Sequence, residues 1–270
     1  MVTRERIELF RSYHRAPSPL LLPNAWDVGS AVAISQVPPC RAIATTSAGV
    51  AWARGYPDGE RIPRDEMLEE VRRIAAAVDV PVTADLEAGY GDPAETARLA
   101  LEAGAVGMNL EDELRPLDES VERVRAALST GIVVNARTDA FLRGGSIEEA
   151  IERLNAYLGA GADCAFAAGV RDADAIERLA REVHGPLSVF AGPGWPTVTE
   201  LRRLGVARIS LAAAVARAAY SLAAAVAEEV FGEGTYERLQ PAAPLPSLNG
   251  LLQSKPDAAA STVASEERHR

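Results

Sequence analysis

The segment "VTADLEAGYGDPAE", residues 82–95, passes from an apolar strand pattern to a helix start within a few residues. Asp92 followed by Pro93 is typical of a helix N-terminus, with an aspartate as N-cap and proline at the first helical position. Asp85 and Glu87 stand two residues apart at the end of the apolar run, so in a strand both side chains point to one face. Two like charges on one face repel each other, which indicates a positive group or solvent beside them.

The same strand-then-helix order recurs along the chain. Eight short apolar runs occupy residues 19–26, 42–48, 81–88, 105–112, 132–139, 162–169, 187–192 and 207–213. Helical patterns lie between them, most clearly over residues 64–78. Further helix starts are indicated by Asp118, Ser146 with Glu149 as a capping box, Asp172, and Thr197 with Glu200. No run is followed by a two-residue hairpin turn, which favours parallel strands joined by crossover helices.

Eight such units closed on themselves predict a (β/α)₈ TIM barrel. An open doubly wound sheet is the alternative, but no Gly-x-Gly-x-x-Gly follows the first strand. The length of 270 residues suits one barrel domain. We therefore expect a single domain over residues 1–253, including C-terminal helices, and a disordered tail over 254–270, which contains Pro and Ala and then charged residues.

Composition limits the function classes. The net charge of −10 argues against a nucleic-acid or anionic-membrane partner, because both require a basic face. Two cysteines make neither a disulfide framework nor a zinc cluster, and no signal-peptide pattern is present, so we expect a cytoplasmic protein. The single lysine is Lys255, in the tail, which excludes Schiff-base chemistry at a barrel lysine.

The alanine-rich stretch over residues 211–227 carries only one charge, Arg217. An outer barrel helix should have a polar face, so this helix is expected to be covered on several sides. A membrane span is the competing interpretation, but alanine is too weakly apolar to drive insertion. Coverage by another subunit, with the helix packed against or exchanged with a neighbour, is favoured and predicts a homo-oligomer.

Polar side chains gather where the first five strands end, and in a TIM barrel these carboxyl ends carry the active site. Asp85 and Glu87 follow the third strand, Glu111 the fourth, and Asp58 lies in "GYPDGE" after the second. Four carboxylates without a local lysine predict a site for a hard cation, Mg²⁺ with Mn²⁺ as a substitute. The alternative is that Asp58-Gly59 is only a turn and that the acids are solvated loop ends.

Arg137, in "NARTDAF", ends the fifth strand beside Glu111 and can grip a carboxylate or phosphonate through two parallel hydrogen bonds. It can also form a salt bridge that only neutralises Glu111. The run "TTSAG", residues 45–49, offers hydroxyls and backbone N–H groups for a second anionic oxygen. Its candidate binding residues are Thr46, Ser47, Ala48 and Gly49, unless the run is merely a polar strand end.

Five motifs in order, "LPNAWDVGSA", "ATTSAGVAW…GYPDGE", "VTADLEAGYGDP", "GAVGMNLEDE" and "VVNARTDAF", resemble the isocitrate lyase/phosphoenolpyruvate mutase superfamily. The resemblance covers about residues 22–217. It implies Mg²⁺ held mainly by Asp85, with Asp58, Glu87 and Glu111 acting through waters. It further implies that Arg137 and residues 47–49 grip a 2-oxo acid, and that the chain forms a tetramer, a dimer of dimers, with the last barrel helix exchanged.

The loop after the fourth strand departs from the family. Lyases of the isocitrate and methylisocitrate type carry Lys-Lys-Cys-Gly-His there, whereas this chain has "ELRPLDES", residues 113–120. The longer, asparagine-containing loop of the mutases is missing too. Cys40 and Cys164 precede or open strands, so we expect them at the opposite barrel end. His14 and His184 are expected to have surface or packing roles.

Together these features predict a magnesium-dependent carbon–carbon lyase that acts on a small 2-hydroxy or 2-oxo carboxylic acid through an enolate. Arg137 would hold the far carboxylate and Asp85 would contact metal and substrate, while Tyr90 is the candidate for proton transfer. The alternatives are a C–C or C–P hydrolase of an oxaloacetate or phosphonopyruvate type of acid, a phosphonate mutase, and a non-catalytic dicarboxylate binder.

Overall fold

A computed structural model describes residues 2–240 and 242–253. The chain divides into two compact units, residues 1–223 and 224–270. The tail predicted over residues 254–270 lies outside the described residues. A single domain over residues 1–253 remains a prediction.

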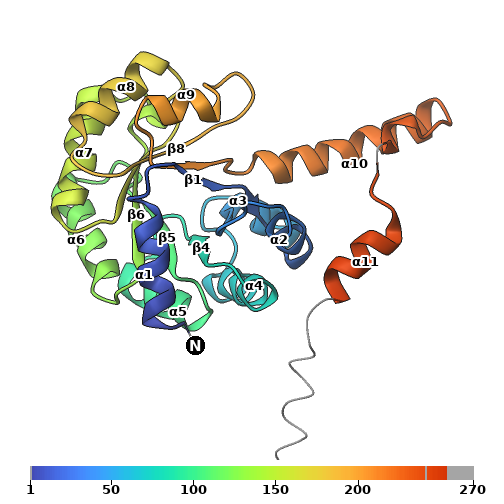
Figure 1. Cartoon of the computed structure of the whole chain (residues 1–270), viewed down its shortest axis with the longest axis horizontal. Coiled ribbons are helices and arrows are strands. Elements are labelled where there is room, and N and C mark those ends of the chain that lie inside the picture. Colours follow the sequence, from blue (N-terminus) through green and yellow to red (C-terminus); the bar gives the residue numbers. More distant parts are fainter. Residues whose placement is uncertain (1, 241, 254–270) are drawn as a thin grey trace, which may run out of the picture. The chain divides into compact units, whose positions relative to one another are not determined.

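Nine parallel strands form one sheet in the described residues, in the order β1-β9-β8-β7-β6-β5-β4-β3-β2. They are β1 (Leu20–Leu22), β2 (Asn24–Ala25), β3 (Ile43–Thr45), β4 (Val82–Asp85), β5 (Gly107–Glu111), β6 (Val133–Thr138), β7 (Cys164–Ala167), β8 (Leu187–Phe190) and β9 (Arg208–Ser210). Strand β1 pairs with β9, and β2 pairs with β3. Since only Pro23 separates β1 from β2, the first extended segment joins both ends of the sheet and closes it into a barrel (Figure 1).

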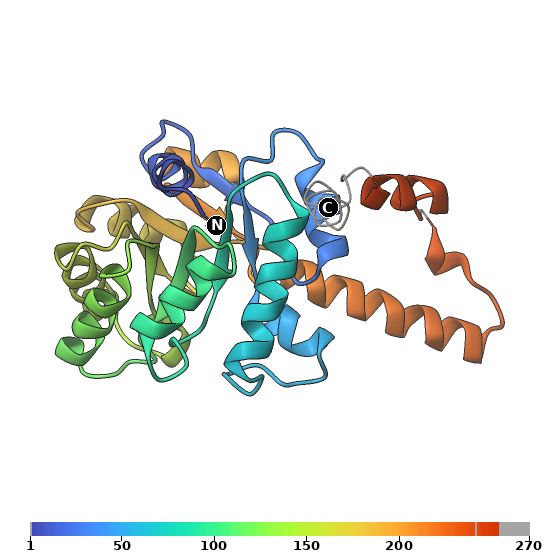
Figure 2. The same cartoon turned by 90° about the horizontal axis from the view of Figure 1, so that it is seen from below.

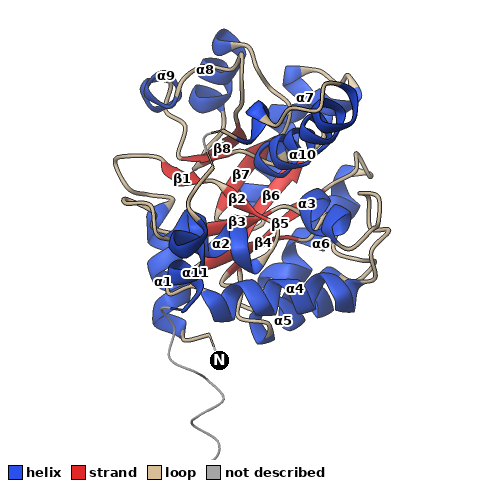
Figure 3. Ribbon diagram, turned by 90° about the vertical axis from the view of Figure 1, so that its right-hand side faces the viewer, coloured by secondary structure: helices blue, strands red, loops and turns tan. Residues whose placement is uncertain are grey.

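Each of the eight predicted apolar runs contains a strand. The first run contains two, β1 and β2, on either side of Pro23. Helices alternate with the strands and surround them (Figure 3). The barrel helices are α1 (Arg4–Tyr13), α2 (Val28–Ser35), α3 (Ser47–Ala53), α4 (Arg64–Ala77), α5 (Pro93–Glu102), α6 (Leu117–Leu128), η1 (Ala140–Arg143), α7 (Ile147–Gly159), α8 (Ala173–Glu182) and α9 (Val198–Arg203). The predicted (β/α)₈ barrel is confirmed.

Most of the predicted helix starts are confirmed. The N-caps Asp92, Ser146, Asp172 and Thr197 each accept a hydrogen bond from the backbone N–H three residues on. Asp118 was wrongly predicted as a cap: Pro116 holds that position in α6, and Asp118 lies in the first turn, where a negative charge is also favourable. Glu149 pairs with Arg153 at 3.1 Å, so the predicted capping box at Ser146 is not formed.

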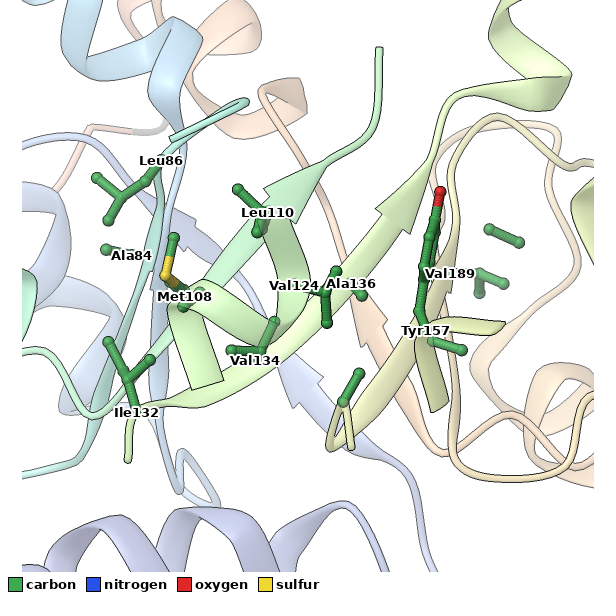
Figure 4. Close-up of a cluster of buried hydrophobic side chains, with 14 of the residues drawn as sticks. Ala84, Leu86, Met108, Leu110, Val124, Ile132, Val134, Ala136, Tyr157 and Val189 are labelled. Atoms are coloured by element: carbon green, nitrogen blue, oxygen red, sulfur yellow. The ribbon is translucent and has the colours of Figure 1, made fainter. Parts of the chain in front are cut away.

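The main core lies between the outer face of the strands and the helices. Figure 4 shows Ala84, Met108, Val134 and Ala136 pointing from successive strands toward this layer, with Val124 of α6 packed among them. Since strand side chains alternate between faces, the residues one position away point into the barrel. Helices α4, α5 and α6, which follow β3, β4 and β5 and are coloured cyan to green, stand beside one another around the strands (Figure 2).

The amino end of the barrel is closed by α1. Phe10 packs with Leu20, Leu22 and Val133 in a second, smaller core cluster. Gly107 on β5 makes this contact possible, because a Cβ there would lie 2.7 Å from Phe10 Cε1. The carboxyl end of the barrel is thus the end left for a functional site.

The last helices are α10 (Ala214–Gly232), η2 (Glu237–Leu239) and α11 (Leu245–Gln253). The first turns of α10 pack on α3, where Tyr220 lies edge to face with Trp52 at a ring-centroid distance of 6.3 Å. Other apolar side chains of α10 are exposed, among them Leu222 at 52% and Phe231 at 88%. In the part of the chain that is described, no helix is both long and apolar enough to cross a bilayer.

Candidate active site

Strand register brings the predicted site residues onto neighbouring strands at the carboxyl end. Asp85 ends β4 and lies opposite Asn109 of β5, while Glu111 ends β5 and lies opposite Arg137 of β6. The side chains alternate along each strand, so Asn109 and Glu111 share the inner face. Three of the predicted residues therefore stand side by side at one mouth of the barrel.

Asp85 is the most heavily hydrogen-bonded carboxylate of this group. Its Oδ2 accepts from the backbone N–H of Ser47 at 3.1 Å and from the Ser47 hydroxyl at 3.0 Å, and its Oδ1 accepts from Asn109 Nδ2 at 3.3 Å. The Ser47 hydroxyl also lies 3.4 Å from Oδ1 of Asp58. Ser47 therefore brings the carboxylates of Asp58 and Asp85 to one point.

Glu87 and Tyr90 occupy the turn after β4, and both have left-handed backbone conformations with φ of 51°. Glu87 Oε2 accepts from the backbone N–H of Glu60 at 2.6 Å, whereas its Oε1 is buried without a hydrogen-bond partner among the described residues. The hydroxyl of Tyr90 is likewise buried and without a partner. Strained backbone and unpaired buried oxygens concentrate at functional sites.

Burial and mutual repulsion shift the titration of these acids. Burial raises the pKa of Glu87 to about 7, with the charges of Asp58 and Asp85 adding to the effect. Burial also raises the pKa of Asp58, and it raises that of Glu111 to about 8 although the Arg137 guanidinium opposes the shift. Burial, then the charge of Glu87, raises the pKa of Tyr90. The site thus brings several acids together in a partly buried position that disfavours their charged forms, and a bound cation would favour those forms.

The donor set fits a magnesium ion that keeps most of its water. Carboxylate oxygens are the ligands that Mg²⁺ prefers, and the unpaired Oε1 of Glu87 supplies an oxygen with no other partner. Within residues 2–240 and 242–253, no three His, Cys, Asp or Glu side chains form a ready-made direct ligand set. Mg²⁺ is commonly bound by one or two carboxylates plus waters, so Asp85 with water-mediated neighbours suffices.

Arg137 faces this cluster from β6. Its Nη1 lies 2.6 Å from Glu111 Oε2 and its Nε 2.7 Å from Asp139 Oδ1, so the salt bridge with Glu111 is present. Its guanidinium also lies 6.0 Å from the centre of the Phe166 ring. The Nη2 group has no hydrogen-bond partner in the described residues, and the side chain is 20% exposed. An edge of the guanidinium therefore remains for an anionic ligand.

Residues 46–49 form the start of α3. Thr46 is the N-cap, and its hydroxyl accepts from the N–H of Gly49 at 3.5 Å. Gly49 allows close packing, because a Cβ there would lie 2.7 Å from Thr46 Cγ2 and 2.8 Å from Trp26 Cβ. Ala48 is buried. Of this segment, Ser47 makes the side-chain contacts to the acidic cluster.

The loop between β5 and α6 is short and tightly held. The carboxylate of Asp112 accepts from the N–H groups of Leu114 and Asp139, both at 3.0 Å, and from the Tyr157 hydroxyl at 2.7 Å. Arg153 Nη1 lies 3.3 Å from the same carboxylate. The loop therefore has a fixed conformation against β6 and α7.

Both cysteines lie at the other end of the barrel, as predicted. Cys164 is the first residue of β7, and Cys40 precedes β3. Burial raises the pKa of Cys164 to about 12 and also raises that of Cys40. Neither thiol is placed or activated for proton transfer at the acidic cluster.

Two contributors to the site were missed from the sequence, Asn109 and Glu60. Asn109 precedes Glu111 by two residues, and strand alternation could have placed it on the same inner face. Glu60 accepts from the Tyr90 N–H at 2.6 Å and gives its own N–H to Glu87. Nothing in the local pattern around Glu60 indicates this contact, which depends on how two loops meet.

A closed parallel barrel with its polar groups at the carboxyl strand ends defines a TIM-barrel enzyme. The family model described as phosphoenolpyruvate phosphomutase matches residues 10–231. The chain belongs to the isocitrate lyase/phosphoenolpyruvate mutase superfamily and is a lyase-like enzyme of that group.

Similar proteins include a solved lyase or mutase of Burkholderia cenocepacia, named as putative, which is 39% identical with a TM-score of 0.87 and covers 94% of this chain and 97% of its own. Oxaloacetate decarboxylase of Pseudomonas entomophila is 33% identical over 56% of this chain and 58% of that protein. 2-Methylisocitrate lyase of Bacillus subtilis is 30% identical over 66% of this chain and 64% of that enzyme. A phosphonopyruvate hydrolase solved with oxalate and Mg²⁺, 22% identical, has the same fold with a TM-score of 0.81, covering 100% of this chain and 99% of its own.

Proposed function

We propose that this chain is a magnesium-dependent lyase that acts on a small 2-oxo or 2-hydroxy carboxylic acid. It would cleave a carbon–carbon bond next to the carbon that carries the oxo or hydroxy group. The observation that carries the proposal is the pairing of an undercompensated acidic cluster around Asp85 with Arg137 on a nearby strand. The acidic cluster suits a cation, and the Arg137 guanidinium suits an anion. A 2-oxo acid chelated by a divalent cation supplies the cation to the first and a carboxylate to the second.

The chain's own residues would divide the work as follows. Asp85 would hold the cation directly, while Asp58, Glu87 and Glu111 would accept hydrogen bonds from its waters. The free edge of Arg137 would bind a carboxylate of the substrate and fix the orientation of the bond that breaks. When bound, Mg²⁺ would act as a Lewis acid that favours negative charge on the 2-oxo oxygen.

Within this class, loss of CO₂ from a 2-oxo acid with a second carboxylate on C3 requires the least from side chains. The C3–C4 bond breaks, its electron pair forms the C2–C3 enolate, and CO₂ leaves. One proton then adds to C3 of the enolate, and the donor is restored by a proton from water. The step needs no thiol, lysine or histidine acid, and the β5–α6 loop, residues 112–116, contains none of these residues.

Tyr90 is a candidate for delivering that proton. Its hydroxyl is buried beside the acidic cluster and has no hydrogen-bond partner in the described part of the chain. Burial, and then the negative charges around it, raise its pKa, which keeps the phenol protonated. Tyr90→Phe would then slow product formation and leave metal binding unchanged.

The test is a substrate panel with Mg²⁺: oxaloacetate, 2-hydroxy diacids and triacids, and phosphonopyruvate, monitored for pyruvate, glyoxylate, oxalate and phosphate. We expect pyruvate or glyoxylate above the rate given by Asp85→Ala at the same Mg²⁺ concentration, a control that also corrects for metal-catalysed loss of CO₂ in solution. Oxalate or phosphate instead would identify the hydrolases. Ligand-dependent stabilisation without any product would identify a dicarboxylate binder.

A further inference from the structure

The barrel interior below the acidic cluster is polar. TIM-barrel interiors are usually filled with branched apolar side chains. The buried inward-facing side chains of β4, β5, β6, β8 and β9 include five polar ones, which form the interior polar layer: Thr83, Asn109, Asn135, Ser188 and Arg208. One member carries a full positive charge in almost complete burial, since Arg208 is only 1% exposed.

Arg208 forms no salt bridge in the described residues, although a buried charge without a partner is costly. Its Nη2 donates to Asn109 Oδ1 at 3.1 Å, and its Nη1 lies 3.3 Å from His14 Nε2. His14 Nδ1 lies 3.2 Å from the Phe10 carbonyl oxygen, so the proton belongs on Nδ1 and Nε2 accepts from Arg208. Burial, aided by the positive charge of Arg208, lowers the pKa of His14 to about 3 and keeps the imidazole neutral.

Asn109 connects this guanidinium to the site. Its Oδ1 accepts from both Arg208 Nη2 and Asn135 Nδ2, the latter at 2.8 Å. Two donors on one oxygen fix the amide orientation, because a flipped amide would direct its NH₂ group at both of them. The Nδ2 of Asn109 is then directed at Asp85 Oδ1, 3.3 Å away.

We propose that Arg208 is a positioning residue that, through Asn109, orients the Asp85 carboxylate for divalent-cation binding and places a compensating positive charge beneath it. This inference rests on the proposed metal site. Arg208 touches neither cation nor substrate. Asn109 donates to Oδ1 of Asp85, and Ser47 donates to Oδ2. With both oxygens held, the carboxylate plane cannot rotate freely.

The test measures Mn²⁺ affinity, by electron paramagnetic resonance of free Mn²⁺ and by calorimetry, on folded full-length variants. Arg208→Met removes both donor and charge, and we expect affinity to fall roughly 10- to 100-fold, as for other groups that orient a metal ligand. Arg208→Lys keeps a charge and a donor and should retain more affinity than Arg208→Met. Ser188→Ala is the matched control, because it alters the same layer on the neighbouring strand without touching Asn109.

A double-mutant cycle separates orientation through Asn109 from a general loss of structure. If Arg208 acts through Asn109, the Arg208→Met, Asn109→Ala double variant binds Mn²⁺ no more weakly than the weaker single variant. Additive losses, or wild-type affinity in Arg208→Met, would overturn the inference. If Arg208→Met does not fold, Arg208→Lys and Asn109→Ala decide: wild-type affinity in both overturns it, and weaker binding in both supports it.

The outcomes also distinguish this inference from the proposed function. Mn²⁺ binding that Asp85→Ala abolishes but Arg208→Met leaves unchanged overturns only the role of Arg208. Absence of Mn²⁺ binding to the wild-type protein overturns the metal site and the inference together.

Discussion

The guanidinium of Arg137 contacts the carboxylates of Glu111 and Asp139, and its remaining N–H groups can bind a ligand. A substitution that cannot make all of these contacts should lower activity. Arg137→Lys keeps the charge but cannot hold Glu111, Asp139 and a ligand in one plane. A hydrogen bond to a charged group is worth about 1.5–3 kcal/mol, so we expect kcat/KM to fall roughly 10- to 100-fold. Steady-state kinetics on the substrate that turns over measures it.

The matched control for Arg137 is a Cys40→Ser, Cys164→Ser double variant. Both thiols lie away from the carboxyl end, so activity should be retained apart from some loss of stability where Cys164 is buried. Circular dichroism establishes that both variants are folded. A folded but inactive double-serine variant would show that a catalytic thiol has been overlooked.

His14 provides a residue with a predictable pH dependence. Its pKa is about 3 in the folded protein and near 6.5 when unfolded, so between these values the unfolded state binds a proton that the folded state does not. The free energy of unfolding attributable to His14 is therefore present above pH 6.5 and is lost as the pH falls toward 3, at up to about 1.4 kcal/mol per pH unit. Arg208 from β9 and Arg11 on α1 are the charges that contribute to this shift.

Urea denaturation at pH 7, 6 and 5 tests this. His14→Gln keeps an acceptor for Arg208 but does not titrate, so its stability should fall less between pH 7 and pH 5 than that of the wild type. His184→Gln, at an exposed position, serves as the control. Equal losses in wild type and His14→Gln would contradict the buried neutral imidazole.

The β5–α6 loop is fixed by Asp112, which connects the ends of β5 and β6 to α7. Asp112→Ala would leave Arg153 buried next to an unpaired Tyr157 hydroxyl. Removing one partner of a buried pair costs about 3–5 kcal/mol, and we expect a loss of this size in the free energy of unfolding. Glu122→Ala, which removes an exposed i, i+3 pair with Arg125, should change stability by about 0.5 kcal/mol or less. A loss below about 1 kcal/mol for Asp112→Ala would mean that the loop is held by other contacts.

At the scale of elements, much could be predicted because local patterns determine it. Alternating apolar runs and caps such as Asp92 gave eight strand positions and most helix starts. The division of the first strand at Pro23 could not be predicted, since it depends on pairing with β9 at one end and β3 at the other. Arg208 could not be assigned either, because its contacts with His14 and Asn109 span 194 and 99 residues of sequence.

The exposed apolar surface bears on the state of the whole molecule. Leu21 on the outer face of β1 is 42% exposed, although barrel strands are normally covered by helices, and Leu222 and Phe231 of α10 are exposed as well. Exposed apolar side chains on a barrel strand and on a helix with few charges favour coverage by a partner. Light scattering at micromolar concentration should therefore give a multiple of the 28.6 kDa chain mass, four chains being the expectation.

A variant can test whether α10 contributes to that assembly. Leu222→Glu places a charge on the exposed apolar face and should shift the particle toward the monomer, whereas Glu228→Gln on the same helix should not. A wild-type monomer would defeat the assembly prediction. A Leu222→Glu protein with unchanged mass would instead show that the interface lies elsewhere.

The closure of the barrel has a consequence for its synthesis on the ribosome. Strand β1 is among the first segments to emerge, but its partner is the last strand: Leu20 to Leu22 pair with β9, and His14 on α1 meets Arg208. Contacts between such distant residues form slowly. The nascent chain must carry His14 and Leu20 without these partners until residue 210 has been translated. The barrel therefore closes late, and chaperone binding should be strongest over this amino-terminal segment.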